Sequence, residues 1–218
     1  MPLVPSTTPQ PRARRTQAER SAATRARLLD ASIGCLIDYG YAGTTTLAVC
    51  KRAGVSNGSL LHHYGTRERL LGATLEAVYG RLRGEVVRRL EALPKGDDRI
   101  DALVDVLWSA FGAPEFKAIL ELWLAAASHA DLSWSMWPEA QAFDEGNVPL
   151  AEALFPEVAA RLPDFSTWIS LIFQVVQGLG LVNATRPSNV ETDALRARTL
   201  TLFKAVLRDA FKAEAAPC

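Results

Sequence analysis

Ser56 is the residue whose type and neighbours most directly suggest chemistry. It lies in GVSNG, residues 54–58, which matches the G-x-S-x-G pattern of nucleophilic serines in α/β-hydrolases. In such enzymes the serine sits on a strained turn between a buried strand and a helix, and a histidine and an acidic residue fold back onto it. A hydrolase therefore requires a strand immediately before Gly54.

The residues before Gly54 favour a helix instead. From 46 to 53 the apolar positions recur at offsets of two to four, and Lys51 and Arg52 would be out of place in a buried strand. Thr45 and Thr46 are good N-cap residues for such a helix, and Gly54 tolerates the left-handed conformation that ends one.

A second short helix is expected directly after this stop. Ser56 is a typical N-cap, and Leu60 and Tyr64 lie four positions apart on one side of residues 57–64. The spacing predicts that GVSNG joins two helices. A serine hydrolase using Ser56 is the weaker alternative, because the candidate bases His62 and His63 would share its helix. We expect no enzymatic activity.

Composition places the chain among globular proteins in water. Of its 218 residues 49% are hydrophobic and 22% are charged. The net charge of zero conceals a division, because residues 1–70 carry +6 and residues 71–218 carry −6. Such a split suggests that the first part meets a polyanion. The most apolar stretch, residues 165–182, is interrupted by polar residues and glycine, so no membrane span is predicted.

The cysteines and histidines form no pattern for a metal or cofactor. Cys35, Cys50 and Cys218 are scattered, which fits a reducing cytoplasm and supports no disulfide framework. His62 and His63 beside Cys50 would lack a fourth zinc ligand. We therefore predict a cytoplasmic protein with neither a metal nor a cofactor.

Helical periodicity runs through the whole chain, so the predicted fold class is all-α, with about nine helices. Residues 1–15 are typical of a flexible basic tail. A helix over 16–39, ended by Gly40, and the two short helices form an N-terminal domain of residues 16–70. A long fourth helix, capped by Thr66, leads into a helical domain of residues 71–218, where Pro138 and Pro149 should kink or split one helix.

Two short helices joined by a tight turn and held against a longer helix form a helix-turn-helix. Its second helix can enter the major groove of DNA, with Leu60 and Tyr64 facing inward. A solvated face of an ordinary three-helix bundle is the alternative. The outward residues are small or hydrogen-bonding, namely Ser56, Asn57, Gly58, Ser59, His62 and His63.

Residues 27–71, RLLDASIGCLIDYGYAGTTTLAVCKRAGVSNGSLLHHYGTRERLL, resemble the DNA-binding domain of the TetR family of bacterial transcriptional repressors. The resemblance includes Gly40 followed by Tyr41, the threonines before the second helix, the turn AGVS, and the pair HY. It implies phosphate contacts by Thr45 and Thr46 and backbone contacts by His63 and Arg67. Ser56, Asn57, Ser59 and His62 would lie in the groove. Leu61 stands where members commonly carry a tyrosine, so that phosphate contact is lost or replaced by contact with a thymine methyl.

The resemblance also implies a C-terminal domain in which a small molecule biases the spacing of two DNA-binding domains. Aromatic residues concentrate there and suit a flat apolar or aromatic ligand, with a few polar side chains to orient it. A solid aromatic core is the alternative. The candidate lining residues are Trp108, Phe111, Trp123, His129, Trp134, Trp137, Phe143, Gln174 and Gln177.

The last helix has two apolar rows, of which one can pack on its own domain while the other needs a partner. The expected partner row is Thr192, Leu195, Thr199, Leu202 and Val206. In the family these positions form a four-helix bundle across a two-fold axis, which predicts a homodimer on a roughly palindromic operator. Arg12, Arg14 and Arg15 could follow the DNA backbone or enter the minor groove, or remain an unattached tail.

The sequence as a whole predicts a DNA-binding transcriptional regulator, a repressor released from its operator by a small apolar or aromatic ligand. A helical DNA-binding module without an effector is the alternative that the residues leave open.

Overall fold

The computed structural model describes residues 16–93, 99–186 and 190–213, and these ranges contain ten helices and no strand. The predicted tail, with Arg12, Arg14 and Arg15, lies outside the described residues, as does Cys218. The all-α class is confirmed, with one helix more than the nine expected. The helices are α1 (Gln17–Gly43), α2 (Thr46–Ala53), α3 (Asn57–Tyr64), α4 (Arg67–Glu91), α5 (Arg99–Phe111), α6 (Pro114–Ala126), α7 (Ala130–Leu154), α8 (Pro156–Arg161), α9 (Phe165–Thr185) and α10 (Val190–Ala213).

Helix α1 is bounded by strong local signals. Thr16 caps it in a capping box, in which its hydroxyl accepts from the Glu19 N–H and the Glu19 carboxylate accepts from the Thr16 N–H. The regular helix breaks at Gly40, whose φ of 67° lies in the region that favours glycine. One further turn continues to Gly43, so the predicted stop at Gly40 is a kink inside a longer helix.

Helix α1 contributes to two cores. One face carries Leu28 and Cys35, which pack with α2 and with Leu60 of α3. The other face carries Ile33 and Leu36, which belong to the large core of the remaining helices. Because a single helix supplies both clusters, the N-terminal helices are attached rigidly to the rest of the molecule.

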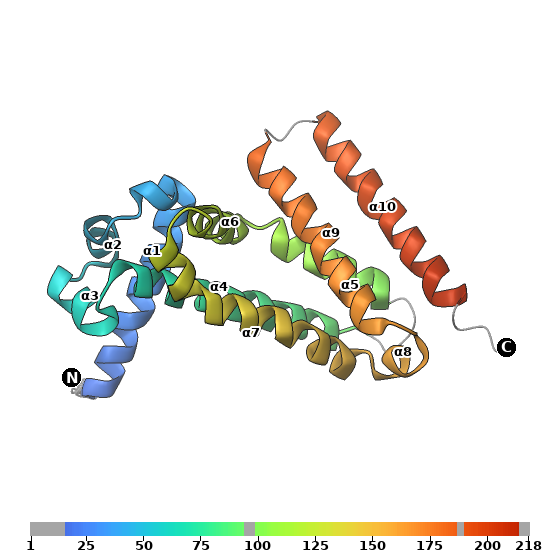
Figure 1. Cartoon of the computed structure of the whole chain (residues 1–218), viewed down its shortest axis with the longest axis horizontal. Helices are drawn as coiled ribbons and strands as arrows, with labels where there is room; N and C mark the ends of the chain where they lie inside the picture. The colour runs from blue at the N-terminus through green and yellow to red at the C-terminus, as the bar shows by residue number, and fades with distance from the viewer. Residues whose placement is uncertain (1–15, 94–98, 187–189, 214–218) are drawn as a thin grey trace, which may run out of the picture.

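Helix α4 connects the two parts of the molecule (Figure 1). Thr66 caps it through the Arg69 N–H, as the sequence predicts. Its first turns bury Leu71 and Leu75, and the buried Thr74 hydroxyl donates to Ser32 of α1 at 2.9 Å. Further along, α4 packs against α5, α6 and α7.

Pro138 and Pro149, which the sequence predicts to kink or split a helix, lie inside the single continuous helix α7 of 25 residues. The expected split does not occur. Met136 and Phe143 on α7 are buried in the core against α4, which holds the helix together around its prolines.

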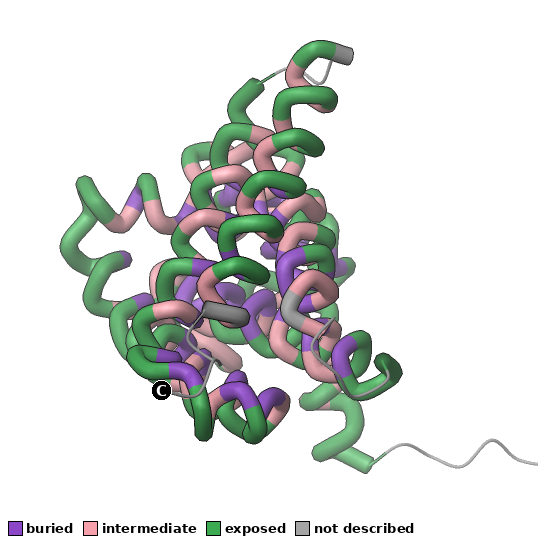
Figure 2. Tube along the Cα trace, turned by 90° about the vertical axis from the view of Figure 1, so that its right-hand side faces the viewer, coloured by how far each residue is buried: buried purple, intermediate pink, exposed green. Residues whose placement is uncertain are grey.

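Helices α9 and α10 form the outermost layer of the C-terminal part (Figure 1). Viewed from that side, much of the pair is exposed (Figure 2). By length and composition α9 is apolar enough to cross a membrane, although core helices pass the same test. Here it packs against α5, α6 and α7 and buries Ile169, Ile172 and Val176.

Candidate functional site

The joint between α2 and α3 is a tight turn made by Gly54, Val55 and Ser56. Gly54 is left-handed, with φ 64° and ψ 41°, and the Val55 N–H donates to the Cys50 carbonyl at 3.1 Å. Ser56 caps α3, and its Oγ accepts from the Ser59 N–H at 3.2 Å. Ser56 thus follows a helix rather than a strand, so the nucleophile-elbow geometry that motivated the hydrolase alternative is not formed.

Helix α3 presents a polar outer face at the end of the molecule remote from α9 and α10 (Figure 1). Its inner side is anchored by Leu60, which is fully buried, and by the partly buried Tyr64. On the outer side Ser59 and His63 are half-buried, and the remaining predicted contacts are exposed, namely Ser56, Asn57, Gly58, Leu61 and His62. The structure therefore brings all seven onto one accessible surface.

The N-terminus of α2 opens toward solvent. The exposed Thr45 caps it by accepting from the Ala48 N–H at 3.1 Å, and Thr46 is half-buried. A helix N-terminus with free donors suits a phosphate, in agreement with the predicted contacts. The neighbouring Leu47 is also exposed, and no signal in the sequence distinguished it from a core residue.

Burial lowers the pKa of His63 below its ordinary value, and the nearby positive charges of His62 and Arg25 lower it further. The rings of His62 and His63 meet edge to face, with centroids 5.3 Å apart. An approaching phosphate would act in the opposite direction and favour the protonated form of His63.

Arg67, for which the sequence predicts a contact with the DNA backbone, also forms hydrogen bonds within the chain. Its Nε donates to the Thr44 carbonyl at 2.8 Å and its Nη2 to the Tyr41 carbonyl at 2.6 Å. Its guanidinium carbon lies 4.2 Å from the centre of the Tyr41 ring. Arg67 thus fastens the end of α1 to the start of α4, and a DNA contact would have to use its remaining N–H groups.

Comparison with known proteins agrees with this geometry. Residues 28–74 match the family described as "Bacterial regulatory proteins, tetR family". These N-terminal residues of the chain thus resemble the tetR family. Over 113 residues it is 39% identical to the HTH-type transcriptional regulator CymR of Pseudomonas putida, a match that covers 52% of this chain and 56% of CymR. The chain thus matches little more than half the length of that relative.

Two further likenesses extend into the C-terminal part. An uncharacterized HTH-type transcriptional regulator of Mycobacterium tuberculosis is 29% identical over 179 residues, covering 79% of this chain and 89% of that protein. The multidrug binding protein EbrR complexed with imidazole is 26% identical, with a TM-score of 0.59 over 81% of this chain and 92% of EbrR. The helix-turn-helix is therefore joined to a C-terminal part whose fold is similar to that of EbrR.

Helix α6 contacts the kinked end of α1 through side-chain hydrogen bonds. The Lys117 ammonium donates to the Ile37 carbonyl at 2.6 Å, and the Glu121 carboxylate accepts from the Tyr41 N–H at 2.8 Å. The His129 ring packs on Tyr41, with centroids 5.1 Å apart. Sequence reasoning missed this junction, because its partners lie about eighty residues apart.

The predicted pocket residues fall into two groups. Phe111, Trp123 and Phe143 belong to one aromatic cluster with Phe116, Phe173 and Tyr79, and adjacent ring centroids in it are 4.0–6.3 Å apart. The Trp123 indole donates to the Tyr79 hydroxyl at 3.0 Å. Sequence reasoning did not single out Phe116, Phe173 or Tyr79.

The other predicted pocket residues lie away from that cluster. Trp134 is 77% exposed and Trp137 61% exposed, so both point to solvent. Gln174 is exposed and Gln177 half-buried, and His129 is held at the junction with Tyr41. Trp108 is half-buried beneath the Arg196 guanidinium, at 5.3 Å. The predicted set is therefore not gathered around one cavity.

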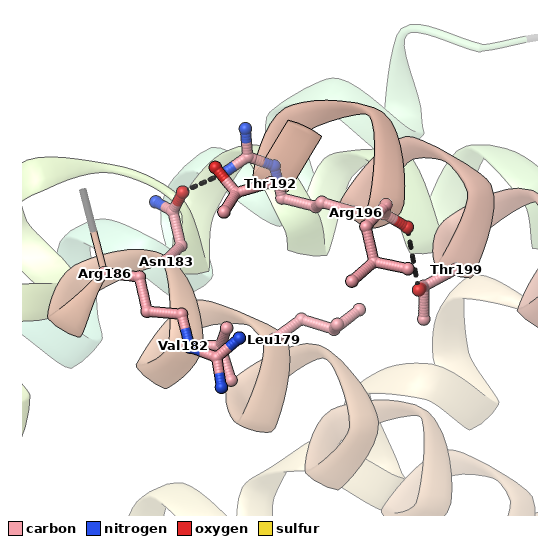
Figure 3. Close-up of a pocket in the computed structure, with 8 residues that line it drawn as sticks. Leu179, Val182, Asn183, Arg186, Thr192, Arg196 and Thr199 are labelled. Atoms are coloured by element: carbon pink, nitrogen blue, oxygen red, sulfur yellow. Dashed lines mark hydrogen bonds between the residues drawn. The ribbon is translucent and has the colours of Figure 1, made fainter. Parts of the chain in front are cut away.

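The three apolar residues of the predicted partner row are exposed, as on an unpaired dimer face, and its two threonines are half-buried. Leu195, Leu202 and Val206 are 61%, 59% and 58% exposed. Thr192, Leu195 and Thr199 also line a groove of about 250 Å³ between α9 and α10 (Figure 3). Across it Leu179 and Val182 of α9 complete the apolar wall, and Arg196 bonds to Asn183. The second row, with Leu200 and Leu207, is buried in the chain's own core.

Proposed function

We propose that this protein is a sequence-specific DNA-binding regulator whose α3 enters the major groove. The supporting observation is that the outer side of α3 is accessible and polar, while Leu60 on its inner side is fully buried. Asn57, Ser59 and His62 would reach base edges, and Gly58 would allow close approach of the backbone. Thr45, Thr46, Ser56 and His63 would contact phosphates, with van der Waals contact from Leu61.

The protein would act as a homodimer joined through α9 and α10. Three apolar side chains of α10 exposed by more than half, beside an apolar groove, form a surface that a second copy would remove from water. A two-fold axis through this surface would present two α3 helices to successive turns of one DNA face. The operator would then be approximately palindromic.

A small-molecule effector would release the DNA, which makes the protein a cytoplasmic, ligand-responsive repressor. Support comes from the contact between α1 and α6. Helix α6, which belongs to the C-terminal part, holds the end of α1 through Lys117 and Glu121. A ligand that displaces α6 would therefore change the position of the DNA-binding helices. EbrR, of similar fold, is described as a multidrug binding protein, which agrees with an effector site in the C-terminal domain.

Footprinting on the DNA that flanks its own coding region tests this proposal. We expect a protected site with two-fold symmetry whose halves lie about one helical turn, or a small multiple of a turn, apart. Binding should weaken steeply with salt, since Lys and Arg contacts release counterions from phosphates. Equal affinity for all sequences at every salt concentration would contradict a sequence-specific regulator. A specific DNA complex that no small molecule releases would instead favour the module without an effector.

A further inference from the structure

Helices α4, α5 and α6 line a cavity of about 310 Å³ that is open to solvent and lies outside the set of residues predicted for the effector. Its floor is apolar and includes Val78 and Leu82 of α4 and Phe116 of α6. Phe116 also belongs to the aromatic cluster, where its ring meets Phe111 at 5.0 Å. The cavity is therefore large and apolar enough for a small organic molecule.

Three arginines line this cavity, all from α4. Arg81, Arg88 and Arg89 occupy its wall together with Glu85 and Glu115, which gives the lining a net charge of +1. Residues 71–218 carry −6 as a whole, so this lining is a positive region in an acidic domain. The local charge favours an anion over a neutral or cationic ligand.

The arginines are already arranged to hold a carboxylate. Glu85 accepts from Arg88 and from Arg89, and Arg89 also donates to the Ser109 hydroxyl at 2.7 Å across the cavity. Hydrogen bonding to Arg89, together with the charges of both arginines, lowers the pKa of Glu85. Each guanidinium has five donors, so the same pair can bind a second carboxylate or exchange one for Glu85.

We propose that this cavity binds a small organic anion, with a carboxylate on Arg88 and Arg89 and an apolar body on Val78, Leu82 and Phe116. This inference names the chemical class of the proposed effector and the site that binds it. Anion binding itself does not depend on the proposed function, and only the resulting release of DNA rests on it.

Two of the three helices that line the cavity, α4 and α6, also hold α1. Arg81 of α4 pairs with Asp30 of α1. On α6, Glu115 and Phe116 line the cavity, and the next residue, Lys117, bonds to the Ile37 carbonyl. A ligand seated beside Arg81 and against the start of α6 would therefore lie next to the contacts that orient the DNA-binding helices.

The test uses the full chain and calorimetry at constant ionic strength, with benzoate and hexanoate as probes and the neutral benzamide and hexanamide as controls. We expect the acids to bind at least about ten-fold more tightly than the amides. Arg88→Gln and Arg89→Gln should each weaken the acids by about ten-fold, equivalent to about 1.4 kcal/mol, and leave the amides unchanged. Arg83→Gln is the matched control, because Arg83 lies on the same helix but packs on Phe143 of α7.

A second variant avoids dependence on the arginines. Ala110→Phe places a ring in the cavity and should abolish binding of acids and amides alike, while thermal melts confirm that each variant is folded. Equal binding of acid and amide, or an acid affinity that survives Arg88→Gln and Arg89→Gln, would overturn the anion site.

DNA affinity, measured by fluorescence anisotropy with and without benzoate, separates the two proposals. Specific DNA binding without any preference for acids overturns the anion site and leaves the regulator intact. Acid binding that depends on the arginines, in a protein without specific DNA affinity, overturns the regulator and leaves the site.

Discussion

Replacing Arg67 by alanine should lower the free energy of unfolding, and this loss should exceed any loss in the free energy of DNA binding. The substitution removes two charge-assisted hydrogen bonds, to the Thr44 and Tyr41 carbonyls at 2.8 and 2.6 Å, and the contact with the Tyr41 ring at 4.2 Å. Because Arg67 is only half-buried, we assign about 1 kcal/mol to each bond, below the usual ~1.5–3, and about 0.5–1 kcal/mol to the ring. The loss is then about 2.5–3 kcal/mol, or roughly 5–12 °C in Tm.

Urea and thermal unfolding measure the stability, and anisotropy titrations over a range of salt concentrations measure the DNA contacts. Arg67→Lys should lose most of the same stability, because a lysine keeps the charge but not the planar fork that reaches both carbonyls. Arg69→Ala, at an exposed position two residues along α4, is the control and should change stability little. The structural role would be refuted if Arg67→Ala left the stability unchanged and reduced the slope of log DNA affinity against log salt concentration by about one. That result would support the phosphate contact instead.

Three further substitutions test the DNA-binding surface and the dimer face. Asn57→Ala should cost about 1–3 kcal/mol against the preferred operator but little against random DNA, as measured by competition titration; equal losses on both would exclude a base contact. DNA affinity should rise as the pH falls, because a phosphate raises the lowered pKa of His63 and binding then takes up a proton, and His63→Gln should remove that dependence. Leu202→Asp should yield monomers in sedimentation, whereas Thr201→Asp, exposed on another side of α10, should leave the dimer intact.

The helix-turn-helix could be predicted from the sequence because its signals are local. Thr45 and Ser56 each cap the helix that directly follows them, and Gly54 adopts the left-handed stop. These features depend on residues three or four positions apart, which a linear reading can assess. The outward face of α3 follows in turn from helical spacing.

The junction and the cavities could not be predicted, because they depend on which helices meet. Nothing in the sequence around Glu121 indicates that its carboxylate accepts from the Tyr41 N–H. In the same way, helical spacing treated Trp134 and Trp137 like the core aromatics, although tertiary packing leaves both exposed. Arg88 and Arg89 give the pattern of an ordinary solvated helix face, and only the packing of α5 and α6 beside α4 shows that they border a cavity.

The kink at Gly40 links the folding of the two halves of the chain. A Cβ at this position would lie 2.9 Å from a Glu121 carboxylate oxygen, and φ 67° would strain any residue that carries one. An excised fragment of residues 16–70 would leave the Ile37 carbonyl and the Tyr41 amide without the α6 groups that satisfy them here, and would expose Ile33 and Leu36 to water. The three N-terminal helices therefore depend on α6 for part of their packing. Loosening the C-terminal half would make the unfolding of these three helices less cooperative.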